Sequence, residues 1–366
     1  MERLPGVERG RFLAFFTYDV ADTIDLSVVP AMLGKCVTSA PLRLRRQNAP
    51  EFVQYSVPPL VATLLPSEEH AGWDLRAKLF DYGVISLCLS LQLTGPWDDF
   101  SLATCALRLD PSLSTEARGA VNRILHEVHG ALDDPHPPLL EEYFIIEVER
   151  FTERVTAQEL LETHRLELAA LVLGENRPLA PSEQHDVLRT NFAYYEDELV
   201  VVGWETAFVY DSSGGAAPIE DILEFANTQL VELRTYDGHL DAELDAIYKH
   251  QPSRPWWSPV GNGVPGPVSQ LRYLIVDVRE LLDRSRNTLK FIGDAYFARL
   301  YRGAAARFGL EAWQRQLDEK LRTIAELYRF AEDREQHLRD NFLEIIIILL
   351  IVIEVVIGFL TLHSVR

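Results

Sequence analysis

The pattern of hydrophobic and polar positions changes about halfway along the chain, from alternation to a helical period. In the first part, residues 11–20 (RFLAFFTYDV) predict a strand, and residues 78–93 predict two strands joined by a tight turn at Tyr82–Gly83. Residues 114–132 have the spacing of an amphipathic helix, and residues 142–151 (EYFIIEVERF) predict a further strand. These elements favour a body of mixed strands and helices.

The middle of the chain carries two local signals. Thr156 and Glu159 have the spacing of a capping box, in which each side chain bonds the other residue's backbone N–H at the start of a helix. Residues 197–211 (DELVVVGWETAFVYD) contain two apolar runs around Gly203–Trp204 and predict a hairpin. The small residues that follow, SSGGAAP at 212–218, mark a domain boundary.

Beyond residue 218 the hydrophobic period is helical. One apolar face continues to about residue 250, where a segment rich in proline and glycine, residues 251–268, interrupts it. A second amphipathic helix is predicted to begin near residue 269. A third runs without proline or glycine between Gly309 and Gly358, so this helix and the C-terminal apolar segment are predicted to form one rod.

The third helix has apolar residues in a seven-residue repeat, which is typical of coiled coils. The candidate oligomer seam consists of Leu310, Leu317, Leu321, Ile324, Tyr328, Leu338 and Phe342. Two interpretations stay open. The seam either packs against the two preceding helices of its own chain or joins copies of the chain in a homo-oligomer.

The C-terminal segment, residues 342–362, predicts a single transmembrane helix that acts as a tail anchor. It has 21 residues, 17 of them strongly apolar, and would form a helix of roughly 32 Å. Glu344 lies at its start, where a carboxylate can reach the interface, whereas Glu354 lies near its middle, where a charge is costly. We expect Glu354 to bond another helix or to be protonated, with proton or ion handling as the alternative.

The charges beside this segment predict its orientation. Four arginines precede it closely and only Arg366 follows it; the four are Arg322, Arg329, Arg334 and Arg339. The positive-inside rule then places the body in the cytoplasm, on a single-pass protein of the cell inner membrane, or on the matrix side in an organelle. The N-terminus has the pattern of neither a signal peptide nor a mitochondrial presequence.

The predicted fold class is therefore α+β. It combines a mixed N-terminal body, long antiparallel C-terminal helices that form a coiled-coil-like stalk, and one C-terminal transmembrane helix. The predicted regions are an α+β subdomain at 1–155, a helix and hairpin that complete the body at 156–212, a helical domain at 213–341, and the span at 342–362.

Composition limits the classes of partner. The chain has 35 Lys and Arg against 55 Asp and Glu, for a net charge of −20. Phosphate backbones repel so acidic a protein, so no direct nucleic-acid binding is expected. The three cysteines form no CxxC pair, which favours small buried thiols in a reducing compartment.

Several short motifs resemble catalytic or ligand sites. Residues 261–266 spell GxGxxG, but no strand precedes them and a proline lies inside, so an interhelical linker is the better interpretation. His126 and His129 are one residue too close for the zinc-protease motif, although a weak metal site with downstream carboxylates is an alternative. Asp19, Asp22 and Asp25 offer a second metal alternative beside a helix cap. We assign no catalytic residue and no metal ligand, and we expect no cofactor.

Three stretches resemble one known family. Leu343–Glu344 followed by an isoleucine-rich run and Ile353–Val355 is similar to the end of the "required for meiotic nuclear division" family, a group of unknown function. FFTYDVADTIDL at 15–26 and LFDYGVISL at 79–87 are similar to that family's opening and central elements. The resemblance implies a membrane-anchored protein that forms large homo-oligomers, with a protein or ribosome-associated partner. No catalytic residues are established for that family, so the resemblance assigns none to this sequence.

Together these observations predict a non-enzymatic, self-associating scaffold or tethering protein, anchored in a membrane and carrying an acidic cytoplasmic body. A membrane-tethered metal-dependent enzyme is one alternative. An accessory transport subunit in which Glu354 titrates is the other.

Overall fold

The protein is described here from a computed structural model. The structure describes residues 3–33, 45–46, 57–175, 177–213, 215–249, 278–279, 294–326 and 351. The chain divides into two compact units. The first contains Met1–Thr235 and Leu282–Trp313, and the second contains Tyr236–Leu281 and Gln314–Arg366.

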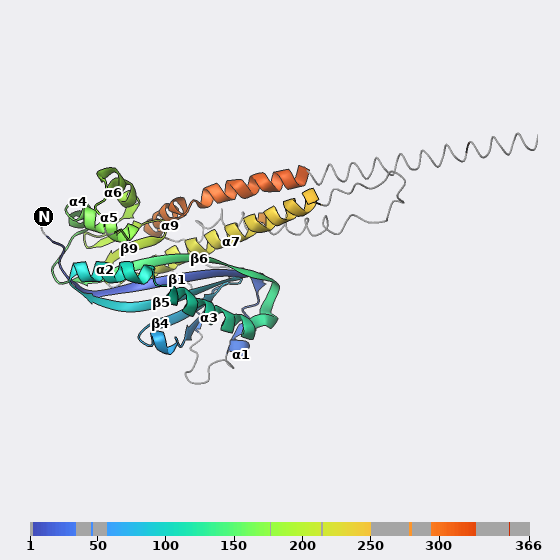
Figure 1. Ribbon diagram of the computed structural model, residues 1–366, viewed down its shortest axis with the longest axis horizontal. Helices are drawn as coiled ribbons and strands as arrows, with labels where there is room; N and C mark the ends of the chain where they lie inside the picture. Colours follow the sequence, from blue (N-terminus) through green and yellow to red (C-terminus); the bar gives the residue numbers. More distant parts are fainter. Residues whose placement is uncertain are drawn as a thin grey trace, which may run out of the picture. The chain divides into compact units, whose positions relative to one another are not determined.

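A mixed β-sheet forms the centre of the first unit (Figure 1). In the described residues it has nine strands in the order β2-β3-β4-β5-β1-β6-β9-β8-β7. The strands are β1 (Val7–Ile24), β2 (Arg45–Arg46), β3 (Leu60–Leu64), β4 (Asp74–Leu79), β5 (Val84–Gly95), β6 (Leu132–Phe151), β7 (Asn191–Phe192), β8 (Glu198–Val202) and β9 (Thr206–Asp211). The long strand β1 lies between β5 and β6 and pairs antiparallel with both.

The two predicted hairpins are confirmed. β4 and β5 pair antiparallel across the predicted turn, where Gly83 has φ of 84° and a Cβ atom would lie 1.6 Å from the carbonyl oxygen of Ala21. Only glycine tolerates both the positive φ and this close approach. β8 and β9 pair antiparallel around Gly203, while β9 joins the rest of the sheet through a parallel pairing with β6.

Besides the strands, the described residues form helices. They are α1 (Val29–Leu33), η1 (Glu68–His70), α2 (Trp97–Arg108), α3 (Pro111–Val128), η2 (His129–Ala131), α4 (Ala157–Glu162), α5 (Arg165–Leu173), α6 (Pro181–Leu188), α7 (Ala217–Lys249) and α9 (Ala295–Arg307), and residues 310–326 are also helical. The predicted capping box is confirmed at the start of α4, where the Thr156 side chain accepts from the Glu159 N–H and Glu159 accepts from the Thr156 N–H.

Alternation along the strands gives the sheet two faces of different character. One face, here called the apolar face, carries Phe12, Ala14 and Phe16 of β1 and packs against α2, α3 and α5 in the main hydrophobic core. The opposite face, here called the charged face, carries Arg11 of β1 and Glu147 of β6 and meets the first half of α7. Figure 1 shows α3 and α7 on opposite sides of the strands.

The described residues correct the predicted fold class in one element. No helix among them is both long enough and apolar enough to cross a bilayer. α7 has sufficient length, at 33 residues, but charged residues such as Glu220, Asp221 and Glu224 recur along it, and charges in a span are costly. The predicted span itself, residues 342–362, lies outside the described residues except for Ile351. The tail anchor, the membrane partner and the inner-membrane location therefore lose their basis and are not carried further.

Candidate functional site

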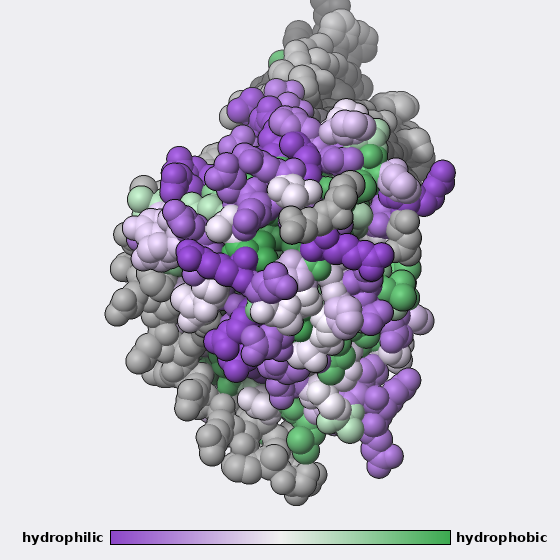
Figure 2. Space-filling model, turned by 90° about the vertical axis from the view of Figure 1, so that its left-hand side faces the viewer, coloured by the Kyte–Doolittle hydropathy of each residue, from purple (hydrophilic) through white to green (hydrophobic). Residues whose placement is uncertain are grey.

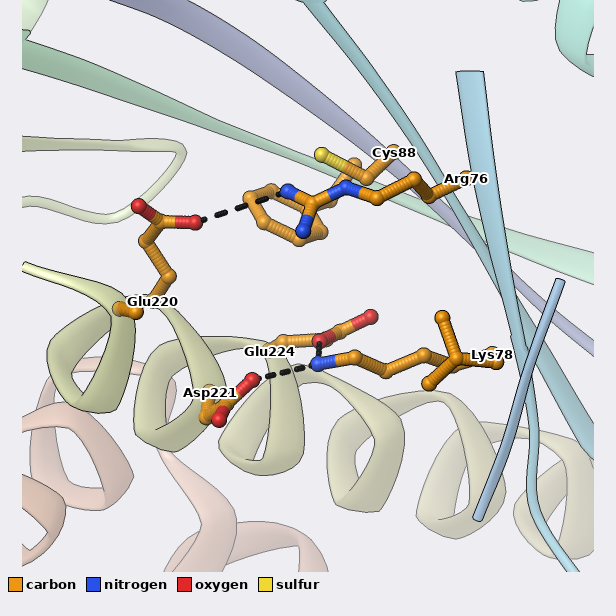
Figure 3. Close-up of a pocket in the computed structure, with 9 residues that line it drawn as sticks. Arg76, Lys78, Cys88, Glu220, Asp221 and Glu224 are labelled. Carbon is orange, nitrogen blue, oxygen red and sulfur yellow. Dashed lines mark hydrogen bonds and ion pairs between the residues drawn. The ribbon is translucent and has the colours of Figure 1, made fainter. Parts of the chain in front are cut away.

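The charged face beneath α7 brings together ionisable side chains of two strands and one helix, all of them buried or half-buried. Arg76 and Lys78 project from β4, Cys88 from β5, and Glu220, Asp221 and Glu224 from the first turns of α7 (Figure 3). With Phe15, Val61 and Ala217 they line a cavity of about 60 Å³. The group follows from local sequence, because Arg76 and Lys78 alternate with the core residues Leu75, Ala77 and Leu79.

Lys78 is held by two carboxylates of α7. Its Nζ donates to Asp221 Oδ1 at 2.5 Å and also to Glu224 Oε2. The Lys78 side chain is only 15% exposed and that of Glu224 only 3%. Arg76 extends the pattern, since its guanidinium lies 3.8 Å from Glu220 Oε2. Each basic residue of β4 therefore faces acidic residues of α7.

Arg11 joins α7 to the centre of the sheet. Its Nη2 lies 2.5 Å from Glu147 Oε2 of β6 and 2.5 Å from Glu220 Oε1 of α7. Burial raises the pKa of the Glu147 carboxyl to about 7, and Glu220 adds to this shift, while the Arg11 charge opposes it. One guanidinium thus balances two buried carboxylates, and one of those carboxylates titrates near neutral pH.

Further along α7 come neutral contacts at residues 227 and 228, and after them an ion pair between Arg234 and Glu141 of β6. Asn227 Nδ2 donates to Thr17 Oγ1 of β1 at 3.0 Å, and the hydroxyls of Thr228 and Tyr82 lie 3.0 Å apart. Helix α9 adds two tyrosine contacts to the same layer, from Tyr301 to Gln229 and from Tyr296 to Glu198 of β8. Polar contacts therefore link α7 to the sheet from its first turn to Arg234.

Cys88 is the cysteine at this interface, and it is buried. Burial raises the pKa of its thiol to about 12, against the opposing effect of Arg76. The nucleophilic form of cysteine is the thiolate, so this thiol is unreactive at neutral pH. This placement agrees with the expectation of small buried thiols, and Cys105 is buried as well.

The described members of the candidate oligomer seam are buried within one chain. Leu310 is 2% exposed, Leu317 and Ile324 are 0% exposed, and Leu321 is 5% exposed. Tyr328, Leu338, Phe342, Glu344 and Glu354 lie outside the described residues. The role of the seam in self-association stays a prediction, and the four buried positions do not form open surface in this conformation.

The residues of the metal alternatives do not assemble into a ligand set. Among the described residues no group of three or more His, Cys, Asp or Glu side chains could hold a metal ion. His126 and His129 are exposed, and His129 Nδ1 lies 2.9 Å from the His126 carbonyl oxygen. Asp25 accepts from Ser27, whereas Asp19 lies 3.3 Å from Nε2 of His136. The GxGxxG string at 261–266 is outside the described residues.

Sequence reasoning missed the charged interface, although a signal was present. In β4 two of the three polar positions of the alternation are basic, and in α7 three acidic residues fall within five positions, Glu220, Asp221 and Glu224. Each pattern is also typical of a solvated surface. The contact between Arg11 and Glu220 spans 209 positions in sequence, so no local rule connects the two patterns.

One end of the protein has a mostly polar surface. Figure 2 shows hydrophilic residues interspersed with small hydrophobic patches, and no continuous apolar area extends across the coloured residues of that view. Exposed large apolar side chains do occur singly, as at Leu109 and Trp204. Scattered residues of this kind are normal on protein surfaces and mark no site by themselves.

Comparison with known proteins identifies one group of relatives. A family model described as "Uncharacterized protein MJ0711, N-terminal domain" matches residues 9–217. The uncharacterized protein MJ0711 of Methanocaldococcus jannaschii is 22% identical over 212 residues, which are 57% of this chain. The matched region spans 63% of that curated relative's length. No solved structure matches. These comparisons do not show the "required for meiotic nuclear division" family, so the ribosome-associated partner that it implied is not carried further.

Proposed function

This chain belongs to the family described as "Uncharacterized protein MJ0711, N-terminal domain", and from that premise we propose that it is a self-associating scaffold or tethering protein whose main role is binding. In this proposal the sheet body holds a helical arm, defined as α7, α9 and the helix at 310–326. The observation that carries the proposal is the ion-paired contact between the charged face and the first turns of α7.

The first support is the position of the family boundary. The family match ends at residue 217, which is the first residue of α7. The sheet therefore belongs to the family region, whereas the helical arm lies beyond it. α7 is in this sense an added element bound to a face of the family domain.

The second support is the chemistry of the contact. Burial of apolar area stabilises a helix on a sheet in many arrangements, because it has no directional requirement. Ion pairs favour the one position of the helix, and the one helix, in which opposite charges meet. Buried ion pairs add little net stability, because the cost of removing both charges from water offsets their attraction. Lys78 with Asp221 and Glu224, and Arg11 with Glu147 and Glu220, are therefore suited to select a helix rather than to hold the fold.

Self-association follows if two copies exchange their arms. The same ion pairs would form between the sheet of one copy and the α7 of the other, so exchange requires no new interface. The sequence between β9 and α7, SSGGA at 212–216, contains two glycines and is suited to a hinge. Exchange would also keep the buried seam residues covered.

The arm has a polar contact of its own in the second unit. Lys320 Nζ lies 2.6 Å from Asp237 Oδ1 and 2.6 Å from Asp241 Oδ1, and Gln316 also donates to Asp237. These contacts join the second half of α7 to the helix at 310–326. In the proposal, the paired helices move together when the arm is exchanged.

A charge-swap experiment on the full chain tests this mechanism. One variant carries Lys78→Glu, and the other carries Asp221→Lys with Glu224→Lys. Within either variant alone, the sheet and the arm carry like charges at their contact. In a mixture, the acidic arm of the Lys78→Glu variant can pair with Lys78 of the other variant. The basic arm of that other variant can pair with the glutamate at position 78, the reversed sheet. We expect light scattering after size-exclusion chromatography to detect a heterodimer in the mixture.

The wild-type chain provides the reference, and Arg150→Glu, a half-exposed change away from α7, serves as the matched charge control. The control should behave as wild type. A wild-type chain that stays monomeric at every concentration, together with a mixture that forms no heterodimer, would overturn self-association by arm exchange.

No specific observation among the described residues supports the alternative of a metal-dependent enzyme. His126 and His129, its main support in the sequence, are exposed and do not converge with carboxylates. We therefore advance the scaffold as the function to test first.

A further inference from the structure

A serine, a histidine and a glutamate meet at the start of α3, apart from the charged face. Ser112 Oγ lies 3.1 Å from His70 Nε2, and His70 Nδ1 lies 3.5 Å from Glu116 Oε2. Ser112 and Glu116 are four positions apart on α3 and so share one side of the helix, while His70 ends the short helix η1. The order of contacts is hydroxyl, imidazole, carboxylate.

The surroundings fix the imidazole in place. His70 is 5% exposed and Glu116 is 7% exposed, and the His70 ring lies edge-on to Trp73 at 6.0 Å between centroids. Ser67 N–H donates to Glu116 Oε1 at 3.2 Å, and Ser67 Oγ lies 3.3 Å from His70 Nδ1. With Nδ1 protonated toward Glu116 and Ser67, the Nε2 lone pair is directed at the Ser112 hydroxyl.

The position of Ser112 favours a nucleophile. Its side chain remains partly exposed while its two partners are buried. It occupies the second residue of the 18-residue helix α3, behind Pro111 and beside the positive end of the helix dipole. The Asp110 carboxylate lies at the same helix end, where bonds from the Ser112 N–H and hydroxyl lower its pKa. Catalytic serines are recognised by such geometry and roles, whatever their order in the sequence.

We propose that Ser112 is a nucleophile for acyl transfer, with His70 as its general base and Glu116 as the residue that positions His70. The substrate class is a small ester that reaches Ser112 from solvent. A cavity of about 270 Å³ lies beside the same turn, lined by Asp110, Pro111, Leu113 and Ser114 among others, but Ser112 does not line it. The proposal is independent of the scaffold function and departs from the expectation that the protein is not an enzyme.

The reaction needs no external oxidant or cofactor. Ser112 Oγ attacks the ester carbonyl while its proton passes to His70 Nε2, and a tetrahedral intermediate forms. The carbon–oxygen bond to the alcohol then breaks, and the alcohol leaves with the proton from His70. A water molecule, deprotonated by His70, hydrolyses the acyl-serine to a carboxylic acid and restores the hydroxyl.

The same contacts could have a purely structural role in joining η1 to α3. Asp110 Oδ1 accepts from the Ser112 N–H at 2.9 Å and caps the helix, and Arg123 lies 3.8 Å from Glu116 Oε1. A structural role predicts loss of stability when these residues are changed. It predicts no covalent reactivity at Ser112.

The test uses a fluorophosphonate probe on the full wild-type chain, with mass spectrometry to locate the adduct. We expect phosphonylation of Ser112 and slow hydrolysis of p-nitrophenyl acetate. His70→Gln should slow the labelling by about 100-fold, the size of a typical general-base contribution. Ser112→Ala should abolish it.

Ser114→Ala is the matched control, because Ser114 lies on the same turn and its hydroxyl donates to the Pro111 carbonyl oxygen at 3.1 Å. It should leave labelling unchanged. The wild-type result stands even where His70→Gln fails to fold. The absence of an adduct on wild-type Ser112, or an adduct confined to other hydroxyls, would overturn the proposal.

Discussion

Helices cover both faces of the sheet, but through different kinds of contact. On the apolar face, Phe12 and Phe144 stack at 5.8 Å between ring centroids within a core that includes residues of α2, α3 and α5. On the charged face, Arg11, Arg76 and Lys78 meet carboxylates of α7, although apolar side chains such as Phe15 are buried there as well. We therefore expect the apolar face to stabilise the fold and the charged face to select a binding partner.

Burial of apolar area contributes about 25 cal/mol per Å² and tolerates many arrangements, whereas a buried charge is costly unless its partner is in place. The apolar face should therefore dominate the free energy of unfolding. The charged face should be sensitive to the loss of one partner but tolerant of the loss of all partners together.

The largest effect is expected on the apolar face. Phe16 is 1% exposed in the main core, and Phe16→Ala should lower the free energy of unfolding by about 3–5 kcal/mol, because it removes apolar contacts and leaves a cavity. Urea denaturation of the full chain measures this change. Leu109→Ala, at an 82% exposed position of the same region, is the control and should have little effect. A comparable loss for both would contradict the division between the faces.

The next effect breaks one partnership on the charged face. Lys78→Met keeps the volume of the side chain but leaves Asp221 and Glu224 without their shared cation. We expect a loss of about 3 kcal/mol in urea denaturation, at the lower end of the range for breaking a buried pair, because Lys78 is 15% exposed. An unchanged midpoint would mean that solvent already screens these charges.

The pH dependence of stability should also be a property of the charged face. Because burial raises the folded-state pKa of Glu147 to about 7, the folded protein binds a proton there that the unfolded chain has lost above its ordinary pKa. Stability from this group is therefore fully present at low pH and declines as pH rises through about 7, by roughly 2 kcal/mol between about pH 5 and pH 7.

Thermal unfolding of wild type and Glu147→Gln across this pH range measures the contribution. The variant should lose this part of the pH dependence, because the amide does not titrate. If both proteins show the same slope, the Arg11 guanidinium keeps Glu147 ionised throughout, and the pairing dominates over burial.

Local signals in the sequence predicted the elements better than their assembly. The strand at β1, the glycine turn between β4 and β5, and the Thr156–Glu159 capping box each depend on neighbouring residues, and each is confirmed. The parallel pairing of β6 with β9 and the contact of Arg11 with Glu220 join distant positions, and no periodicity encodes them. The transmembrane helix was predicted from the apolarity of one window and has no counterpart among the described residues.

The smallest change in stability is expected when the charged contact is replaced as a set. Lys78→Met combined with Asp221→Leu and Glu224→Met removes all three charges of one cluster and keeps similar volumes. The free energy of unfolding should stay within about 1 kcal/mol of wild type or increase, because the desolvation cost disappears together with the attraction. The matched comparison is Lys78→Met alone.

Charge-swap mixing distinguishes the two roles of this interface. The triple variant should be stable, yet its arm should pair equally with wild-type sheets and with Lys78→Glu sheets, because positions 221 and 224 no longer carry a charge that selects a partner. Heterodimer yields from light scattering would then lose their dependence on the partner's charges. A triple variant that keeps the wild-type preference would place selectivity at Arg11 and Glu220 instead, because that ion pair is untouched by the three substitutions.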